Sequence, residues 1–247
     1  MISRIRTIKA ITQLMESTQT VRFNAALPIS VDVLAKIGYN RYRLKVGHKE
    51  MTTRSQKPLQ EKKRYWGNFS ESKEGILTIS NLREKPSLLQ YHDKYLHVDS
   101  LDFLELFTLS SSPYTAFKEW LLNELSLCTV PKDFELLSSM LLALHEGIVH
   151  LPLFVYNRPL LIQWKESNNK TLNESWIDFY LAFDNMGPVR GNIDLLAKTL
   201  KMSLLFEKTA ALFLAHQENA PLAFQLDVKE SLSPLWKGDD ALLDIKG

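Results

Sequence analysis

Apolar residues alternate through three successive runs between Trp176 and Phe206, and a helical pattern follows them. Alternation with a period of two is typical of half-buried strands, whereas apolar spacings of three and four are typical of a helix. The region therefore predicts a three-stranded meander, followed by a helix from Glu207 to about Gln217. The alternating positions are Ile177, Phe179, Leu181 and Phe183, then Val189, Gly191, Ile193 and Leu195, then Leu200, Met202, Leu204 and Phe206. The helix positions expected to face inward are Ala211, Leu212 and Ala215.

A second alternating pattern lies between Ile29 and Leu82 and predicts a small β unit of about five strands. So many short strands in so short a segment favour an OB-like or other small barrel. We assign residues 18–84 to this barrel. Residues 1–17 carry isoleucines at a spacing of three with basic residues between them, which predicts an amphipathic helix. This helix packs on the protein's own body, contacts a membrane surface or serves as an export signal.

The middle of the chain changes to a helical period, and we assign residues 85–147 to a helical connector. A proline at the first helical position after Ser112 predicts a helix toward Leu127, and a further helix follows Pro131 and ends at Gly147. Residues 148–247 form a mixed α+β domain that opens with a hairpin, and the polar stretch 166–174 is expected to be a loop. Pro152 favours an edge position for the first hairpin strand. The predicted fold class is α+β.

Composition and the length of the apolar runs argue against an integral membrane protein. The chain has 247 residues, 45% of them hydrophobic, and 30 basic residues against 28 acidic ones. No apolar run approaches the roughly 20 residues of a membrane-spanning helix. The single cysteine, Cys128, cannot form an internal disulfide and is expected to be a small buried group.

Signatures of catalysis are missing from the sequence, so we expect no enzyme, no cofactor and no metal. His145 and His150 are five residues apart around a glycine, which places them on different faces of any helix. Asp178 and Asp184 lie on the polar face of the first meander strand, and the simplest interpretation is that both are ordinary exposed carboxylates.

The β unit carries a local excess of basic residues. Basic and aromatic side chains together are the means by which OB folds bind single-stranded nucleic acid. This alternative predicts a nucleic-acid surface made of Arg41, Arg43, Lys45, Tyr65 and Trp66. A solvated strand face and a buried Trp66 would give the same pattern.

The meander and its first corner resemble the C-terminal domain of flagellar hook-length control proteins. That family has a strand ending in L-G-x-V, two alternating strands and a helix. The matching residues here are Met186-Gly187-Pro188-Val189, and methionine replaces the usual leucine. Family members that measure length carry a long polar N-terminal segment, in whose place this chain has a β unit and helices. We therefore expect the chain to keep the switch-type domain for another export or assembly task and not to act as a ruler.

The resemblance implies protein binding without catalysis. In that family the C-terminal domain engages the cytoplasmic part of the switch subunit of the flagellar type III export gate. The resemblance thus implies a cytoplasmic protein, with export through that apparatus as the alternative expectation. It places the partner-binding corner at Asn185, Met186, Gly187, Pro188 and Val189. A plain structural turn is the alternative interpretation of these five residues.

Overall fold

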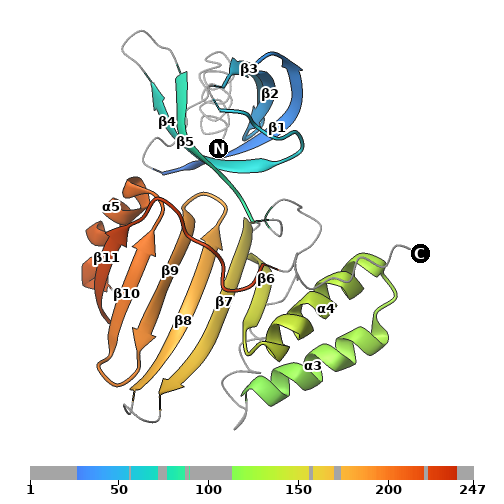
Figure 1. The fold of residues 1–247 in the computed structure, drawn as a ribbon, viewed down its shortest axis with the longest axis vertical. Helices are drawn as coiled ribbons and strands as arrows, with labels where there is room; N and C mark the ends of the chain where they lie inside the picture. Colours follow the sequence, from blue (N-terminus) through green and yellow to red (C-terminus); the bar gives the residue numbers. More distant parts are fainter. Residues whose placement is uncertain are drawn as a thin grey trace, which may run out of the picture.

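The computed structural model describes residues 27–55, 57–71, 77–86, 89, 113–155, 158–169, 174–219 and 222–237. Within these ranges the chain has two β-sheets and three α-helices, which confirms the mixed α+β class. The two sheets follow one another along the long axis of the molecule (Figure 1). Among the described residues, no helix has the length and apolar content needed to cross a bilayer.

The first sheet, sheet A, has the strand order β3-β2-β1-β4-β5 and is antiparallel throughout. Alternate apolar residues of its strands form one core, to which Met51 of one edge strand and Ile79 of the other both contribute. The described residues show no pairing between the two edge strands, so no closed barrel is seen within them. The strands are β1 (Ile29–Gly38), β2 (Arg41–Val46), β3 (Lys49–Arg54), β4 (Arg64–Glu71) and β5 (Leu77–Glu84).

The second sheet, sheet B, has the order β11-β10-β9-β8-β7-β6. It is antiparallel except for its last pair, β10 and β11, which run parallel and are connected through α5 (Glu207–Ala215). The expected meander is therefore confirmed, and a parallel edge strand extends it. The strands are β6 (Val149–Val155), β7 (Arg158–Asn169), β8 (Glu174–Phe183), β9 (Gly187–Asp194), β10 (Thr199–Leu204) and β11 (Ala223–Val228).

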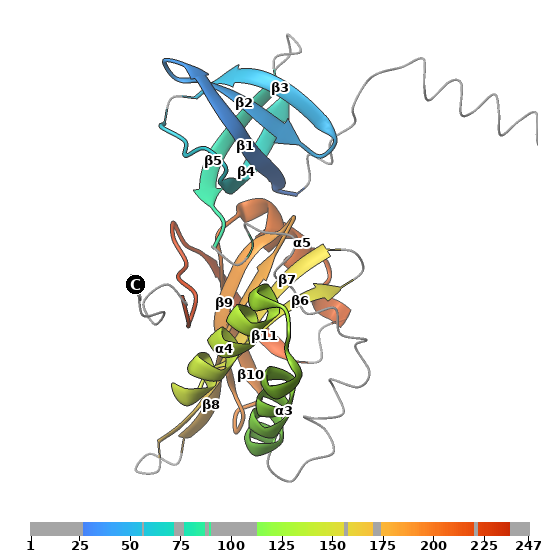
Figure 2. The same ribbon diagram turned by 90° about the vertical axis from the view of Figure 1, so that its right-hand side faces the viewer.

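Helices α3 (Pro113–Leu127) and α4 (Pro131–His145) begin and end close to the expected residues. Gly147 follows the second helix with a φ of +73°, the left-handed conformation of a helix-ending glycine. Buried residues of both helices share a core with β6 and β7, including Phe117, Met140 and Val149. The helical segment thus covers one end of sheet B (Figure 2).

Two details of the sequence interpretation were wrong. The polar stretch 166–174 is not simply a loop, because β7 continues to Asn169 and pairs there with the start of β8. Cross-strand hydrogen bonds hold this polar ribbon although it lacks apolar alternation. Helix α5 buries Thr209 and Ala210, whereas Ala211 and Ala215 are exposed. The amphipathic helix expected at residues 1–17 and residues 90–112 of the helical connector lie outside the described residues.

The two faces of sheet B are covered differently. Phe213 of α5 packs on one face, against the core that contains Val189 and Leu204. The segment 229–237 crosses the opposite face, where the fully buried amide of Gln163 accepts hydrogen bonds from two backbone N–H groups of that segment, at 2.8 and 3.1 Å. Residues after β11 are therefore part of the fold.

The corner between β8 and β9 depends on a glycine. Gly187 has a φ of +81°, which residues other than glycine rarely adopt. A Cβ added there would lie 2.6 Å from the ring of Phe206, the residue before α5. The chain thus needs glycine both for the turn and for the approach of the helix start.

Replacing Gly187 with alanine should destabilise the protein by about 3 kcal/mol, because positive-φ strain and overlap with Phe206 add together. Gly147→Ala is the matched control, since Gly147 also has positive φ but a Cβ there meets Lys165 only at an ordinary 3.8 Å. It should cost about 1 kcal/mol. Urea unfolding measures both, and equal losses would contradict the role given to Phe206.

Candidate interaction site at the junction of the sheets

The predicted corner is a tight turn of three residues between Phe183 and Gly187. Gly187, Pro188 and Val189 are buried, whereas Asn185 and Met186 are partly exposed. The Thr209 hydroxyl donates a hydrogen bond of 2.6 Å to the Met186 carbonyl, which ties the turn to the first residues of α5. The corner is therefore a rigid structural turn that presents two of its five residues.

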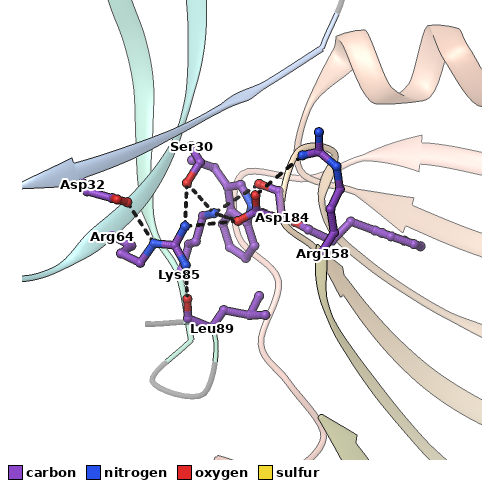
Figure 3. Close-up of polar contacts among 9 residues, drawn as sticks. Ser30, Asp32, Arg64, Lys85, Leu89, Arg158 and Asp184 are labelled. Atoms are coloured by element: carbon purple, nitrogen blue, oxygen red, sulfur yellow. Dashed lines mark hydrogen bonds and ion pairs between the residues drawn. The ribbon is translucent and has the colours of Figure 1, made fainter. Parts of the chain in front are cut away.

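Asp184, which opens this turn, connects the two sheets. Its Oδ1 lies 2.5 Å from the Nζ of Lys85, a residue that directly follows β5 of sheet A. The Lys85 side chain is 0% exposed and also donates to the Ser30 hydroxyl and the Asp184 carbonyl, at 2.8 and 3.1 Å (Figure 3). All three hydrogens of the ammonium group thus have acceptors, as a buried lysine requires.

A second cation, Arg64, reaches the same carboxylate. Its Nη2 is 3.4 Å from Oδ1 of Asp184, while its Nε donates to Asp32 at 2.8 Å and its Nη1 donates to the Leu89 carbonyl at 3.0 Å (Figure 3). Arg64 and Lys85 are neighbours because Lys85 N donates to the Arg64 carbonyl. Two adjacent cations are therefore held by carboxylates from both sheets.

Trp66 lies at the same junction. Its Nε1 donates a hydrogen bond of 2.8 Å to the Phe183 carbonyl, and the Nζ of Lys85 lies 5.6 Å from its ring centroid. The side chain is 1% exposed and belongs to a core with Tyr180 and Ala182 of sheet B and with Phe206, which precedes α5. Trp66 therefore joins the sheets, and its ring is not available for stacking on a ligand.

In this cluster, burial and the neighbouring opposite charges shift the pKa values of Lys85 and Asp184 in opposite directions. Burial lowers the pKa of Lys85 to about 8, although Asp184 pulls it upward. Burial alone would raise the pKa of Asp184, but Lys85, Arg64 and the more distant Arg158 together bring it below its ordinary value. The simple interpretation of Asp184 as an exposed carboxylate was wrong, since its side chain is 13% exposed.

The residues predicted for nucleic-acid binding are divided by the fold. Arg41 and Arg43 are exposed on β2, and Lys45 is partly exposed on the same face. Tyr65 is 7% exposed, and its hydroxyl accepts a hydrogen bond from Gln60 N at 3.1 Å. The structure brings the basic residues together but places both predicted aromatic residues in the interior.

A cavity of about 500 Å³ opens beside the junction, between the end of β5, one face of sheet B and the segment 230–237. Its walls mix aromatic rings, such as Trp66 and Trp236, with charges of both signs, including Lys63 and Glu230. The described residues contain no group of three or more His, Cys, Asp or Glu side chains placed to hold a metal ion. The cavity carries no arrangement specific for one reaction.

His150 is a buried histidine on the face of sheet B that also carries Gln163. It lies on β6, fully buried, with Nδ1 2.9 Å from Nε2 of Gln163. Burial lowers its pKa to about 3, so the ring is neutral at physiological pH.

The sequence indicated no role for Lys85 and Arg64, which hold the junction together. Both are single charged residues at strand ends, and no spacing pattern connects them to Asp184, 99 residues further along the chain from Lys85. Only their unusual burial distinguishes them from other charged residues at strand ends, and this burial is visible only in the folded structure.

The chain matches no protein-family model, no curated protein and no solved structure. Its function must therefore be inferred from the geometry and from the resemblance of the corner.

Asp184→Asn should destabilise the protein by about 3 kcal/mol, because it leaves Lys85 and Arg64 buried without their shared carboxylate. Lys85→Met should cost less, since Asp184 keeps Arg64 and Arg158. Asp227→Asn is the control, as Asp227 pairs with Lys229 while both side chains are more than half exposed, and its loss should cost about 0.5 kcal/mol or less. Urea unfolding followed by tryptophan fluorescence measures all three. A Lys85→Met loss as large as that of Asp184→Asn would contradict this order.

The stability difference between wild type and Lys85→Met should depend on pH between about 8 and 10.5. The folded protein releases the Lys85 proton near 8 and the unfolded chain near 10.5, so the unfolded state binds more protons in this window. Wild type should therefore gain stability relative to the variant as the pH rises, by about 3 kcal/mol at most. Unfolding free energies at several pH values test this, and a difference that is constant or falls with pH would contradict it.

Proposed function

We propose that the chain is a non-enzymatic protein-binding component similar to flagellar hook-length control proteins, which docks on the flagellar type III export apparatus. The observation that carries this proposal is the order strand, glycine turn, strand, strand, helix, with Gly187 at the turn and Phe206 packed on it. The proposed partner is the cytoplasmic domain of the switch subunit of the export gate. The proposed location is cytoplasmic, with export through the same apparatus as a further possibility to be tested.

The partner surface that we propose begins at the accessible part of the corner. Asn185 and Met186 are partly exposed, and Glu207 is exposed at the start of α5, two residues before the Thr209 that binds the Met186 carbonyl. We call Asn185, Met186 and Glu207 the corner face. Methionine is enriched in protein interfaces, because its flexible side chain adapts to the partner.

The corner face is held from three directions. Thr209 binds the Met186 carbonyl, the Phe206 ring contacts Gly187, and Lys85 binds Asp184. A surface that is already rigid loses little conformational entropy on binding, so more of the contact energy contributes to affinity. Three residues are much less than a stable interface requires, so the partner must also contact surface around them.

For sheet A we propose an OB-like small barrel that is open between β3 and β5. Its strand order and the shared core of Met51 and Ile79 support this architecture. Single-stranded nucleic-acid binding is the alternative function. The exposed Arg41 and Arg43 favour it, whereas the burial of Tyr65 and Trp66 removes the stacking surface on which it depended.

Met186→Glu should weaken binding of the full-length chain to the gate's cytoplasmic domain at least tenfold, since it places a charge in the interface. Leu127→Glu is the matched control, because Leu127 is exposed at the end of α3, away from the corner. It should leave the affinity unchanged. Pull-down followed by calorimetry gives the affinities, and unfolding curves establish that both variants fold.

Deletion of the gene in a flagellated host supplies the cellular test. Hooks of altered length are expected if the chain acts in the export switch. Absence of association together with hooks of normal length would rule out the proposed function. Binding that Leu127→Glu weakens and Met186→Glu spares would place the interface on the helices instead of the corner.

A further inference from the structure

Two large apolar side chains project from the turn between β1 and β2. Tyr39 is 91% exposed and Ile37 is 49% exposed. The turn itself is tight, with Asn40 in the left-handed conformation at a φ of 53°. Tight turns usually carry small polar residues, so an exposed tyrosine and isoleucine at this place call for a partner.

Cationic side chains surround this turn. Arg41 on β2 lies directly opposite Arg54 on β3, and Arg43 lies opposite Thr52. All three arginines are exposed. Like charges placed directly opposite on adjacent strands repel each other. Within the described part of the chain, none of the three has an ion-pair partner.

Acidic groups near these arginines are few. Lys45 lies opposite Glu50 at the other end of the same strand pair, so those charges balance. Glu61 accepts a hydrogen bond from the backbone N–H of Lys36 at 2.7 Å. The side chain of Lys36 is itself exposed and adds a fourth cation beside Ile37. The end of the sheet that carries the turn therefore has a positive excess.

The turn lies at the end of sheet A that faces away from sheet B (Figure 2). β1 starts at the junction, where Ser30 binds Lys85. At about 3.3 Å per residue, Tyr39 lies up to roughly 30 Å along the strand from Ser30. The junction and sheet B thus leave this end of sheet A uncovered.

We propose that Lys36, Ile37, Tyr39, Arg41, Arg43 and Arg54, which we call the cationic tip, bind the surface of an anionic lipid membrane. Tyrosine prefers the level of the lipid headgroups, and an isoleucine beside it can enter the acyl boundary. The arginines would pair with headgroup phosphates and gain the opposing charge that Arg41 and Arg54 lack. This contact is peripheral, and it does not depend on the function proposed for the corner face.

The composition of the tip favours lipid over nucleic acid. Nucleic acid binds through stacking of successive bases on several aromatic rings beside cations, and Tyr39 is the single ring of the cationic tip, because the two aromatic residues predicted for that role are buried. Ile37 offers no ring on which a base could stack. An exposed aliphatic side chain and an exposed amphipathic aromatic side chain beside a cluster of cations are the elements of an interfacial membrane contact.

Co-sedimentation of the full-length chain with vesicles tests the proposal. Vesicles of pure phosphatidylcholine are compared with vesicles in which roughly one third of the lipid is phosphatidylserine. We expect binding to the anionic vesicles alone, and we expect it to weaken at high salt. A fluorescently labelled single-stranded oligonucleotide is titrated in parallel.

Three variants separate the contributions. Arg41→Gln/Arg43→Gln/Arg54→Gln should lower the partition coefficient on the order of 100-fold, at about fivefold per arginine. Ile37→Ser/Tyr39→Ser should lower it about tenfold. Lys118→Gln/Lys132→Gln/Lys201→Gln removes the same charge from other elements and should change it no more than about threefold. All of the altered positions are exposed and none lies in a hydrophobic core, so all three variants should fold, which circular dichroism verifies.

Residues 1–17 are retained in every variant, so any binding that they cause would survive the arginine substitutions. Wild-type affinity of the triple arginine variant for anionic vesicles would therefore overturn the proposal. Absence of wild-type binding to those vesicles would overturn it as well. Oligonucleotide binding that needs the three arginines, without vesicle binding, would replace it with the nucleic-acid alternative.

Discussion

The carboxylate of Asp184 is the constraint on which the arrangement of the two sheets depends. It lies between Lys85 and Arg64 at the end of sheet A, and all three groups are largely buried. Removing such charges from water is costly, and the cost is offset only where every donor finds an acceptor in good geometry. A small rotation of one sheet against the other would break several of these contacts at once. The cluster therefore specifies one relative placement of the sheets more than it adds net stability.

The same residue couples the junction to the corner face. Asp184 is followed directly by Asn185 and Met186, and the Trp66 indole binds the carbonyl of the preceding Phe183. A partner that contacts the corner face thus contacts a turn whose conformation is held by sheet A. Binding at the corner and placement of sheet A are for that reason linked in free energy, and each must affect the other to the same extent.

Alternation of apolar residues predicted the meander and most strands of the β unit, because the inward-facing positions of a strand recur every two residues along the sequence. Proline and glycine at helix ends likewise predicted α3 and α4. The ribbon at 166–174 was missed because polar strands held by cross-strand hydrogen bonds carry no apolar signal. The junction was missed for a different reason. Lys85 and Asp184 are far apart in the sequence, and the same residue types serve elsewhere as ordinary solvated charges, so only the tertiary fold distinguishes them. The sequence pattern predicted a turn at Gly187 and an apolar position at Phe206, but it did not predict the contact between these two residues.

The corner face and the cationic tip lie toward opposite ends of β1, which begins at the junction and ends at the turn. A strand paired on both sides is stiff, so the two surfaces are held at a fixed separation. Each surface alone is small, and each would bind weakly. A protein partner located at an anionic membrane would nevertheless engage both, and the second contact would then form at a high effective concentration. A fixed separation between the two surfaces raises the affinity only where the partner's binding site lies at the same distance from the membrane. The junction, which orients sheet A, would therefore also determine which membrane-associated partners the chain binds strongly.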